Sequence, residues 1–479
     1  DPRSDLHLDG RARPGGRSAA ACRERLHLVA TEQRRAAVRR PRASQPPATH
    51  VGIQRRSRHA EQLGGLVRAD HRAHPLRMRA GVDFVNVDRI NVDQRRSSMD
   101  PGCMSNSIDV PPGLNGVVAA DTAIGAVDGD RGFFHYGPHD ATALARSRSF
   151  EEVWYLVRNG RLPDPAEAAA FRHEVASLRR VPDELWPVIR VAAATDAPML
   201  AKLRSVLSVG AGPLGLASVI DVDDGGRRAQ TLRLAAVVPS ILAALHRLGD
   251  GRDAVEPDAS LGHAASYLLQ VTGEVPTPVA ARAVEQYLIL TIDHGFNAST
   301  FTARVVASTG ADPGDAVCAA LGALAGPLHG GAPSRALDAL DAIATVDATA
   351  DWVRGEVAAG RRIMGFGHAV YRAPDPRSAL LREVAERLGG PLVELAVAVE
   401  GEILVTLAEL KPDRPLPSNV EFYAGVVMAT AGLPRSMFTP TFAVSRTVGW
   451  CAHVVEQAAA GKLIRPSSRY VGPPVVPPA

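Results

Sequence analysis

The feature that most constrains the fold of this chain is a succession of helix-forming segments that starts near Leu114. In each segment apolar residues recur at spacings of three and four, which is the period of one face of an α-helix. Short turns containing proline or glycine separate the segments, and no repeat of fixed length runs through them, which argues against a solenoid. Helices are expected over residues 197–208, 229–248, 280–292, 378–388, 392–410 and 440–460. The sequence therefore predicts an all-α fold class.

One short stretch ahead of the helices has a different pattern. Residues 122–136 (TAIGAVDGDRGFFHY) contain two short apolar runs on either side of Asp128-Gly129. Asp-Gly between two such runs is a typical β-hairpin turn. We therefore predict a small N-terminal hairpin in an otherwise helical chain.

The first hundred residues differ from the rest in charge and texture. They contain 21 arginines, no lysine and 11 acidic residues, a net charge of +10 in a chain whose total is +3. Only residues 81–92 alternate like a strand. A nucleic-acid-binding arm would interleave lysines and aromatics, and a transit peptide would be poor in acids, so neither alternative fits well. We expect residues 1–103 to be an Arg-rich, disordered or non-native upstream extension without a chemical role.

Composition excludes several classes of protein. Apolar residues make up 46% and charged residues 22%, which excludes a wholly disordered or collagen-like chain. The uncharged apolar stretch near residues 317–328 is too short to span a bilayer. The cysteines are far apart and match no metal-ligand spacing, so we expect neither a disulfide framework nor a metal site. We also expect a reducing, cytoplasmic compartment. They are Cys22, Cys103, Cys318 and Cys451.

Three histidines adjoin glycine at points where a helix is interrupted. His294 lies in Asp293-His294-Gly295, His329 in GPLHGG (326–331) and His368 at the end of GFGH (365–368). Glycine lets a ligand approach the backbone closely, and loops on a rigid scaffold often carry binding groups. Taken singly, such a histidine is more often structural, and none of the three has the i, i+4 spacing of a helical pair of metal ligands.

Taken together, five segments resemble the citrate synthase family, over a match from about Leu114 to Pro473. They are GPLHGG (326–331), GFGHAVYRAPDPR (365–377), NVEFYAG (419–425), MFTPTFAVSRTVGW (437–450) and IRP (464–466). The resemblance implies a helical, two-domain homodimer. A small domain over residues 333–436 would interrupt a large domain made of residues 104–332 and 437–479, and hinge closure between them would exclude water.

The resemblance implies that the chain condenses acetyl-CoA with oxaloacetate and hydrolyses citryl-CoA to citrate and CoA, a transferase reaction of the tricarboxylic acid cycle. A carboxylate must take a proton from the thioester methyl group while a neutral donor stabilises the enolate oxygen. The family pattern makes His329 that donor and Glu421 the general base. His368 would donate to the oxaloacetate ketone and polarise it for attack.

The remaining site residues implied by the resemblance bind the two substrates. A dianion needs a cationic pocket, and guanidinium groups match carboxylates in a bidentate manner. The carboxylate-binding set is His294, Arg377, Arg446 and Arg465, of which Arg465 would reach the partner subunit's site. The CoA-binding set is Gly365, Gly367 and Arg372, with Arg372 near the phosphates. The resemblance implies no permanently bound cofactor, no metal, no nucleic acid and no membrane partner.

Two positions depart from the family pattern. The usual Asn-Val-Asp is here Asn419-Val420-Glu421, and the extra methylene lengthens the reach of the carboxylate by about 1.5 Å. A misplacement of about 1 Å can cost on the order of 10²-fold in rate, so we expect the backbone to compensate. Residues 136–139 read Tyr-Gly-Pro-His, where the family usually has Tyr-Arg-Gly-Tyr, a change at the start of the first helix.

Two alternative functions stay open. A 2-methylcitrate synthase would use propionyl-CoA in the same site, and one methylene in a pocket is worth only about 1–3 kcal/mol. A non-catalytic paralogue that binds CoA or a dicarboxylate is the second alternative, prompted by Glu421.

Overall fold

The computed structural model describes residues 108–476 except 328, 330, 331 and 369, without the side chains of residues 332–336. The Arg-rich segment over residues 1–103, the alternating stretch at 81–92, Cys22 and Cys103 lie outside the described residues. The predictions for them are therefore not tested.

Helices dominate the described part of the chain, as predicted, and each of the six expected helices forms with small shifts of its ends. They are α6 (Met199–Val209), α7 (Asp224–Gly249), α9 (Pro278–Thr291), α14 (Pro376–Leu388), α15 (Pro391–Leu410) and α17 (Phe438–Ala460). Three of them, α9, α14 and α15, begin with proline, whose fixed φ suits the first helical position.

Ten further helices, which were not predicted from the sequence, precede or separate these six in the described residues. They are α2 (Ala141–Ser147), α3 (Phe150–Asn159), α4 (Pro165–Ser177), α5 (Trp186–Ala193), α8 (His263–Thr272), α10 (Ala298–Ala307), α11 (Pro313–Leu324), α12 (Ala332–Ile343), α13 (Thr349–Ala358) and α16 (Val420–Thr430). Capping boxes start two of them, with Ser149 and Glu152 at α3 and Asp164 and Glu167 at α4.

The predicted hairpin is present, with a longer turn and one additional strand. Strands β1 (Gly125–Asp128) and β2 (Phe133–Tyr136) pair antiparallel, and residues 129–132 form the loop between them. A two-residue strand, β3 (His139–Asp140), pairs with β2 on its other side. The tip of the hairpin touches the segment after His368, because the backbone N–H of Arg372 donates to the carbonyl oxygen of Gly129 at 2.9 Å.

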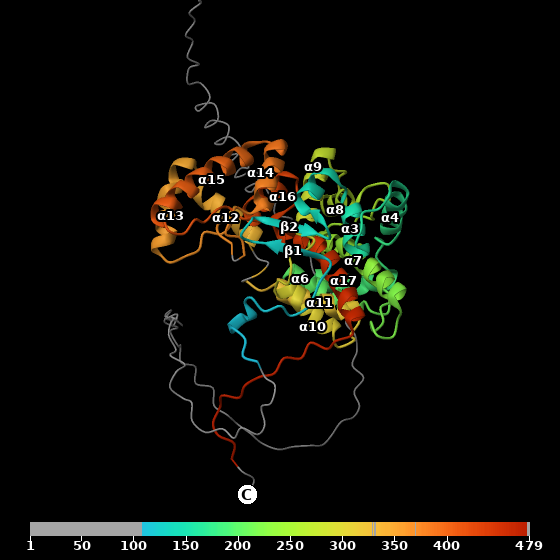
Figure 1. Cartoon of the computed structure of the whole chain (residues 1–479). Helices are drawn as coiled ribbons and strands as arrows, with labels where there is room; N and C mark the ends of the chain where they lie inside the picture. The colour runs from blue at the N-terminus through green and yellow to red at the C-terminus, as the bar shows by residue number, and fades with distance from the viewer. Residues whose placement is uncertain (1–107, 328, 330–331, 369, 477–479) are drawn as a thin grey trace, which may run out of the picture. The chain divides into compact units, whose positions relative to one another are not determined.

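The centre of the core is α7, against which α17 packs (Figure 1). By length and composition α7 could cross a membrane, so among the described residues the longest apolar helix is α7 and not the stretch at residues 317–328. However, 78% of its most apolar window is buried inside the protein, as in the central helix of a large core. In this structure α7 is a core helix.

Helices α12 to α16 gather on one side of the hairpin, and α3, α4, α7 and α8 lie on the other (Figure 1). Between the two groups, α14 and α16 pack against α9, and α12 packs against α17. The end of α9, the first half of α17 and the start of α16 meet where the two groups adjoin. The expected domain limits at residues 333 and 436 stay predictions.

Candidate active site

A pocket of about 670 Å³ opens where α9, α16 and α17 adjoin the loop before α14. Eight of the ten residues expected in the site line it: His294, His329, Gly365, Gly367, His368, Arg377, Glu421 and Arg446. They come from segments up to 152 residues apart in the chain. The structure thus brings together most of a set that the sequence identified only by motif.

His368 is held by the backbone of the residues that follow it. Its Nδ1 accepts hydrogen bonds from the backbone N–H groups of Val370, at 2.9 Å, and Tyr371, at 3.0 Å. A neutral ring with Nδ1 as acceptor carries its proton on Nε2, which lies 3.2 Å from Nη2 of Arg377. Two donors that face each other in this way both suit an oxygen of a ketone or carboxylate. Burial, and next the charge of Arg377, lower the pKa of His368 to about 4.

Arg377 is a buried cation with a rigid partner. Asp375 caps α14 by accepting from the backbone N–H of Arg377, and its two oxygens also accept from Nε at 3.0 Å and Nη2 at 2.9 Å. One of these oxygens accepts the backbone N–H of Val420 as well, at 3.0 Å, which ties α14 to α16. Burial alone would lower the pKa of Arg377, but Asp375 outweighs it and raises that pKa above its usual value. The guanidinium therefore stays charged inside the protein.

His294 and Arg446 also line the pocket, and His294 is in contact with the loop of His368. Nε2 of His294 lies 3.0 Å from the hydroxyl of Tyr371. Nε of Arg446 donates to the carbonyl oxygen of Thr291 at 2.8 Å, and its guanidinium lies 4.6 Å from the ring centre of Phe442. Burial, followed by the charges of Arg377 and Arg446, holds the pKa of His294 well below its usual value.

His329 enters the pocket from the turn after α11. Its Nε2 lies 2.8 Å from Oγ of Ser299, which also accepts from the indole N–H of Trp450 at 3.3 Å. Oγ of Ser299 lies 2.8 Å from Oδ1 of Asn297 too. Burial, and next the charge of Arg446, lower the pKa of His329 to about 4. The ring is thus neutral at physiological pH.

Glu421 lies in the first turn of α16, and Asn419 connects that turn to residues 365–367, the glycine loop. The side chain of Asn419 caps α16 by accepting from the backbone N–H of Glu421 at 3.0 Å, and it donates to the carbonyl oxygen of Gly367 at 2.8 Å. Its backbone N–H donates to the carbonyl oxygen of Gly365 at 2.8 Å. The position of Glu421 relative to this loop is therefore fixed by one residue.

Gly365 cannot be replaced without strain. Its φ is +89°, and an added Cβ would lie 3.0 Å from Cβ of Phe422. Only glycine adopts that backbone region readily at such a close approach. The loop therefore lies directly on α16, beside Glu421.

Two expected site residues do not line the pocket. Arg372 is 85% exposed and pairs with Asp130 of the hairpin loop, with Nη1 3.2 Å from Oδ1. Arg465 is exposed in the segment that follows α17. In this single chain, therefore, neither Arg372 nor Arg465 reaches the pocket.

Other residues of the pocket were missed at the level of motifs. Arg361 and Arg362 line it directly before the glycine loop, and Asn297 lines it as well. Tyr371 is not in the lining, but its hydroxyl bonds to His294. The pair of arginines ahead of Ile363-Met364-Gly365 was a visible signal. Asn297 belongs to none of the five motifs. Tyr371 lies within one of them, but its bond to His294 joins distant segments, which no local spacing reveals.

The pocket combines neutral hydrogen-bond donors, buried cations and a carboxylate. Such a set can bind a dianion, polarise a carbonyl group and remove a proton from carbon. Within the described residues, no group of three or more His, Cys, Asp or Glu side chains is placed to hold a metal ion.

Comparisons with known proteins identify a family for the chain. The family described as citrate synthase, C-terminal domain, matches residues 113–467. A citrate synthase from Haloferax volcanii is 40% identical over 368 residues, covering 75% of this chain and 95% of that protein. A citrate synthase from Synechocystis is 38% identical over 365 residues, covering 75% of this chain and 90% of that protein.

Solved structures give the same result. A citrate synthase from Pyrobaculum aerophilum matches with a TM-score of 0.71 and 32% identity, covering 78% of this chain and 99% of that chain. A ternary complex of carboxymethyl coenzyme A and oxaloacetate with the enzyme from Thermoplasma acidophilum matches with a TM-score of 0.70 and 28% identity, covering 76% and 96%. The family resemblance expected from the five motifs is confirmed, and the chain belongs to the citrate synthase family.

Proposed function

We propose that the chain condenses acetyl-CoA with oxaloacetate and hydrolyses the citryl thioester, with His329, His368 and Glu421 as its catalytic residues. The observation that carries the residue assignment is their meeting with Arg377 and Arg446 in one pocket. Curated relatives named citrate synthase support the reaction class.

Oxaloacetate binds between the two buried arginines. Arg377 and Arg446 take its carboxylates, and His294 donates to one of them. Nε2–H of His368 donates to the ketone oxygen and increases the positive charge on the carbon that is attacked. The ring suits this role because its Nδ1 is already occupied by two backbone donors.

Glu421 then removes a proton from the methyl group of the thioester, and His329 donates to the thioester oxygen as negative charge develops there. For this, His329 must carry its proton on Nδ1, because Nε2 faces Ser299. Ser299 lies 2.8 Å from both Nε2 of His329 and Oδ1 of Asn297, so rotation of its hydroxyl hydrogen determines which ring nitrogen is protonated.

CoA lies along the glycine loop of Gly365 and Gly367, with its phosphates near the arginines. Arg361 and Arg362 already line the pocket, and Arg361 is paired with Glu356 at 2.7 Å. Arg372 reaches the phosphates once it leaves Asp130, an exchange that costs little because the pair is exposed to solvent.

The active unit is a homodimer in which Arg465 completes the site of the partner subunit. The exposure of the segment after α17 supports this arrangement, since Leu463 is 57% and Tyr470 61% exposed in the single chain. The small domain over residues 333–436 closes on the large one during turnover. A cytoplasmic location and a place in the tricarboxylic acid cycle complete the proposal.

A paired kinetic assay tests the substrate. Release of free thiol is measured with oxaloacetate and either acetyl-CoA or propionyl-CoA. We expect kcat/KM to favour acetyl-CoA, whereas a preference for propionyl-CoA would establish 2-methylcitrate synthase instead. Binding of both substrates without any thiol release would leave the non-catalytic alternative.

A further inference from the structure

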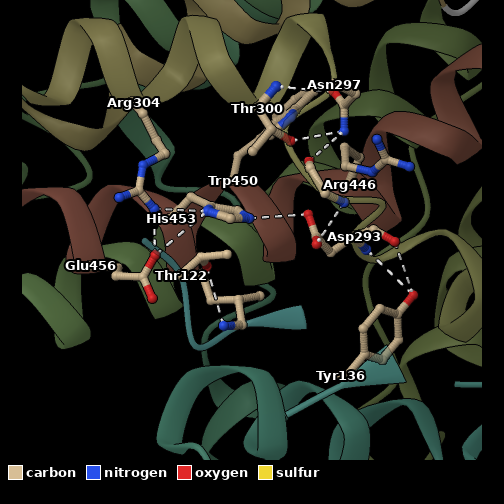
Figure 2. A network of polar contacts seen from close by, with 12 residues as sticks. Thr122, Tyr136, Asp293, Asn297, Thr300, Arg304, Arg446, Trp450, His453 and Glu456 are labelled. Atoms are coloured by element: carbon tan, nitrogen blue, oxygen red, sulfur yellow. Dashed lines mark hydrogen bonds and ion pairs between the residues drawn. The ribbon is translucent and has the colours of Figure 1, made fainter. Parts of the chain in front are cut away.

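A buried chain of polar side chains runs from the turn that carries His294 toward the surface (Figure 2). It joins Asp293, His453, Arg304 and Glu456 in that order. The first three are at most 1% exposed, whereas the side chain of Glu456 is 25% exposed. None of the four lines the site pocket, so substrate binding does not by itself account for them.

The direction of each hydrogen bond in this row of four side chains follows from which groups can donate and which can only accept. A guanidinium only donates, so Nη1 of Arg304 donates to Nδ1 of His453 at 3.1 Å. The ring therefore carries its proton on Nε2, which donates to Oδ1 of Asp293 at 3.1 Å. Burial raises the pKa of Asp293, but His453 and the charge of Arg446 together hold it below its usual value.

Glu456, the last of these four side chains, is bonded to the segment that leads into the hairpin. Glu456 accepts from Nη1 of Arg304, and its other oxygen accepts from the backbone N–H of Ala123 at 2.7 Å. Arg304 also donates through Nε to Gln457 at 2.9 Å. Arg304 is thus fixed from two sides and can hold the ring of His453 in one tautomer.

Asp293 closes the turn on which His294 is presented. Its second oxygen accepts from the backbone N–H of Gly295 at 3.1 Å, and Gly295 has a φ of +63°. The hydroxyl of Tyr136 donates to the carbonyl oxygen of Ile289 at 2.8 Å and lies 3.3 Å from the carbonyl oxygen of Asp293 (Figure 2). A change in the Asp293 carboxylate would therefore move His294.

The same helix that carries His453 also carries Arg446. The two residues are seven apart, which is two turns, so they lie on one face of α17. Arg446 holds the carbonyl oxygen of Thr291 and His453 holds the side chain of Asp293. One helix face therefore fixes the segment between them at two points.

We propose that His453 is a positioning residue for oxaloacetate binding: through Asp293 it fixes His294 relative to Arg446. The proposal rests on the substrate-binding roles given above to His294 and Arg446. It concerns affinity for the dicarboxylate, because His453 touches neither substrate nor the reacting atoms.

Two substitutions of similar size separate the two hydrogen bonds of His453. The amide nitrogen of glutamine lies near the position of Nε2, so H453Q keeps a donor to Asp293 and loses the acceptor for Arg304. The amide of asparagine lies near Nδ1, so H453N keeps the acceptor for Arg304 and loses the donor to Asp293. The dissociation constant of oxaloacetate is measured by calorimetry, and KM, kcat and the melting temperature are measured alongside.

We expect the dissociation constant and KM for oxaloacetate to rise about 10-fold in H453N and to stay within about threefold in H453Q, with kcat little changed in both. H246Q is the control for loss of a buried histidine, since His246 is 6% exposed and lies outside the pocket. It should bind oxaloacetate like the wild type.

Wild-type affinity in H453N would overturn the proposal, and so would equal losses in H453N, H453Q and H246Q that follow the melting temperature. If H453N does not fold, D293N takes its place, because one amide oxygen cannot accept from both His453 and Gly295 as the carboxylate does. D293N with wild-type affinity would also overturn the proposal. Binding is measured without turnover, so a wild-type enzyme that forms no citrate would refute the proposed reaction separately.

Discussion

Gly449 of α17 and Ile292, directly after α9, are packed so closely that a Cβ on Gly449 would lie 2.1 Å from the carbonyl oxygen of Ile292. The two backbones meet at the segment that precedes Asp293 and His294. Because α17 also carries Arg446, this contact sets how near the arginine comes to the histidine.

Replacing Gly449 by alanine should therefore lower both stability and activity. The backbone must shift to admit the methyl group, and overpacking of this kind costs about 1–3 kcal/mol, occasionally more. G401A is the matched control, because a Cβ at Gly401 of α15 meets nothing within 4 Å. Its melting temperature should stay the same or rise, since alanine favours a helix. Equal melting temperatures for G449A and the wild type would contradict the close contact.

Replacing Glu421 by glutamine should reduce kcat by at least about 10²-fold, because a positioned general base contributes that much. Oxaloacetate should still bind, since Arg377 and Arg446 are unchanged. The result is measured as thiol release beside calorimetric binding of oxaloacetate. Full activity in E421Q would exclude Glu421 as the base.

E421D tests the extra methylene at the same position. Because Asn419 fixes the first turn of α16 on the glycine loop, a shorter side chain cannot recover its reach by moving the backbone. We expect kcat of E421D to fall by about 10-fold or more. A kcat equal to or above the wild type would show that the backbone places no demand on the longer side chain.

Stability should fall as the pH is lowered from about 6.5 toward 4. The folded-state pKa values of His329 and His368 are about 4, below the value of about 6.5 in an unfolded chain. Between these limits the unfolded state binds more protons than the folded state, so acid favours unfolding. The melting temperature measured at closely spaced pH values checks this. H329N should flatten the dependence, and an unchanged slope in that variant would contradict it.

Substitutions at Arg372 and at its exposed partner Asp130 should change KM for acetyl-CoA in opposite directions. R372Q should raise KM for acetyl-CoA about 10-fold, because it removes a charge-assisted contact with a phosphate. D130N releases Arg372 and should lower this KM by at most about threefold, the value of an exposed pair. An unchanged KM in R372Q would exclude Arg372 from the CoA site, and R362Q would then be the variant to compare.

Local patterns predicted six of the helices and the hairpin, and motifs selected eight residues that line one pocket. The period of three and four residues marked α9 and α17 within a few residues, although every residue of α17 from Ala443 to Cys451 is buried. Asp128-Gly129 marked the hairpin but not its four-residue loop, which contacts the segment around Arg372.

What the sequence did not reveal depends on contacts between distant segments. His453 and Arg304 belong to no motif, and only the approach of α10 to α17 joins them to Asp293. Arg372 sits inside the most specific motif, yet tertiary packing places its side chain on Asp130. The motifs therefore identified candidate site residues, while the packing of the helices determined which of these residues line the pocket.

The hairpin has a consequence for how the protein is made. Its leading residue Ala123 bonds to Glu456, which is 333 positions later in the chain. At a synthesis rate of about 5–20 residues per second, the hairpin leaves the ribosome roughly 20–70 s before that partner exists. The turn of His294 can be fully braced only when α17 has emerged, so α17 completes the pocket.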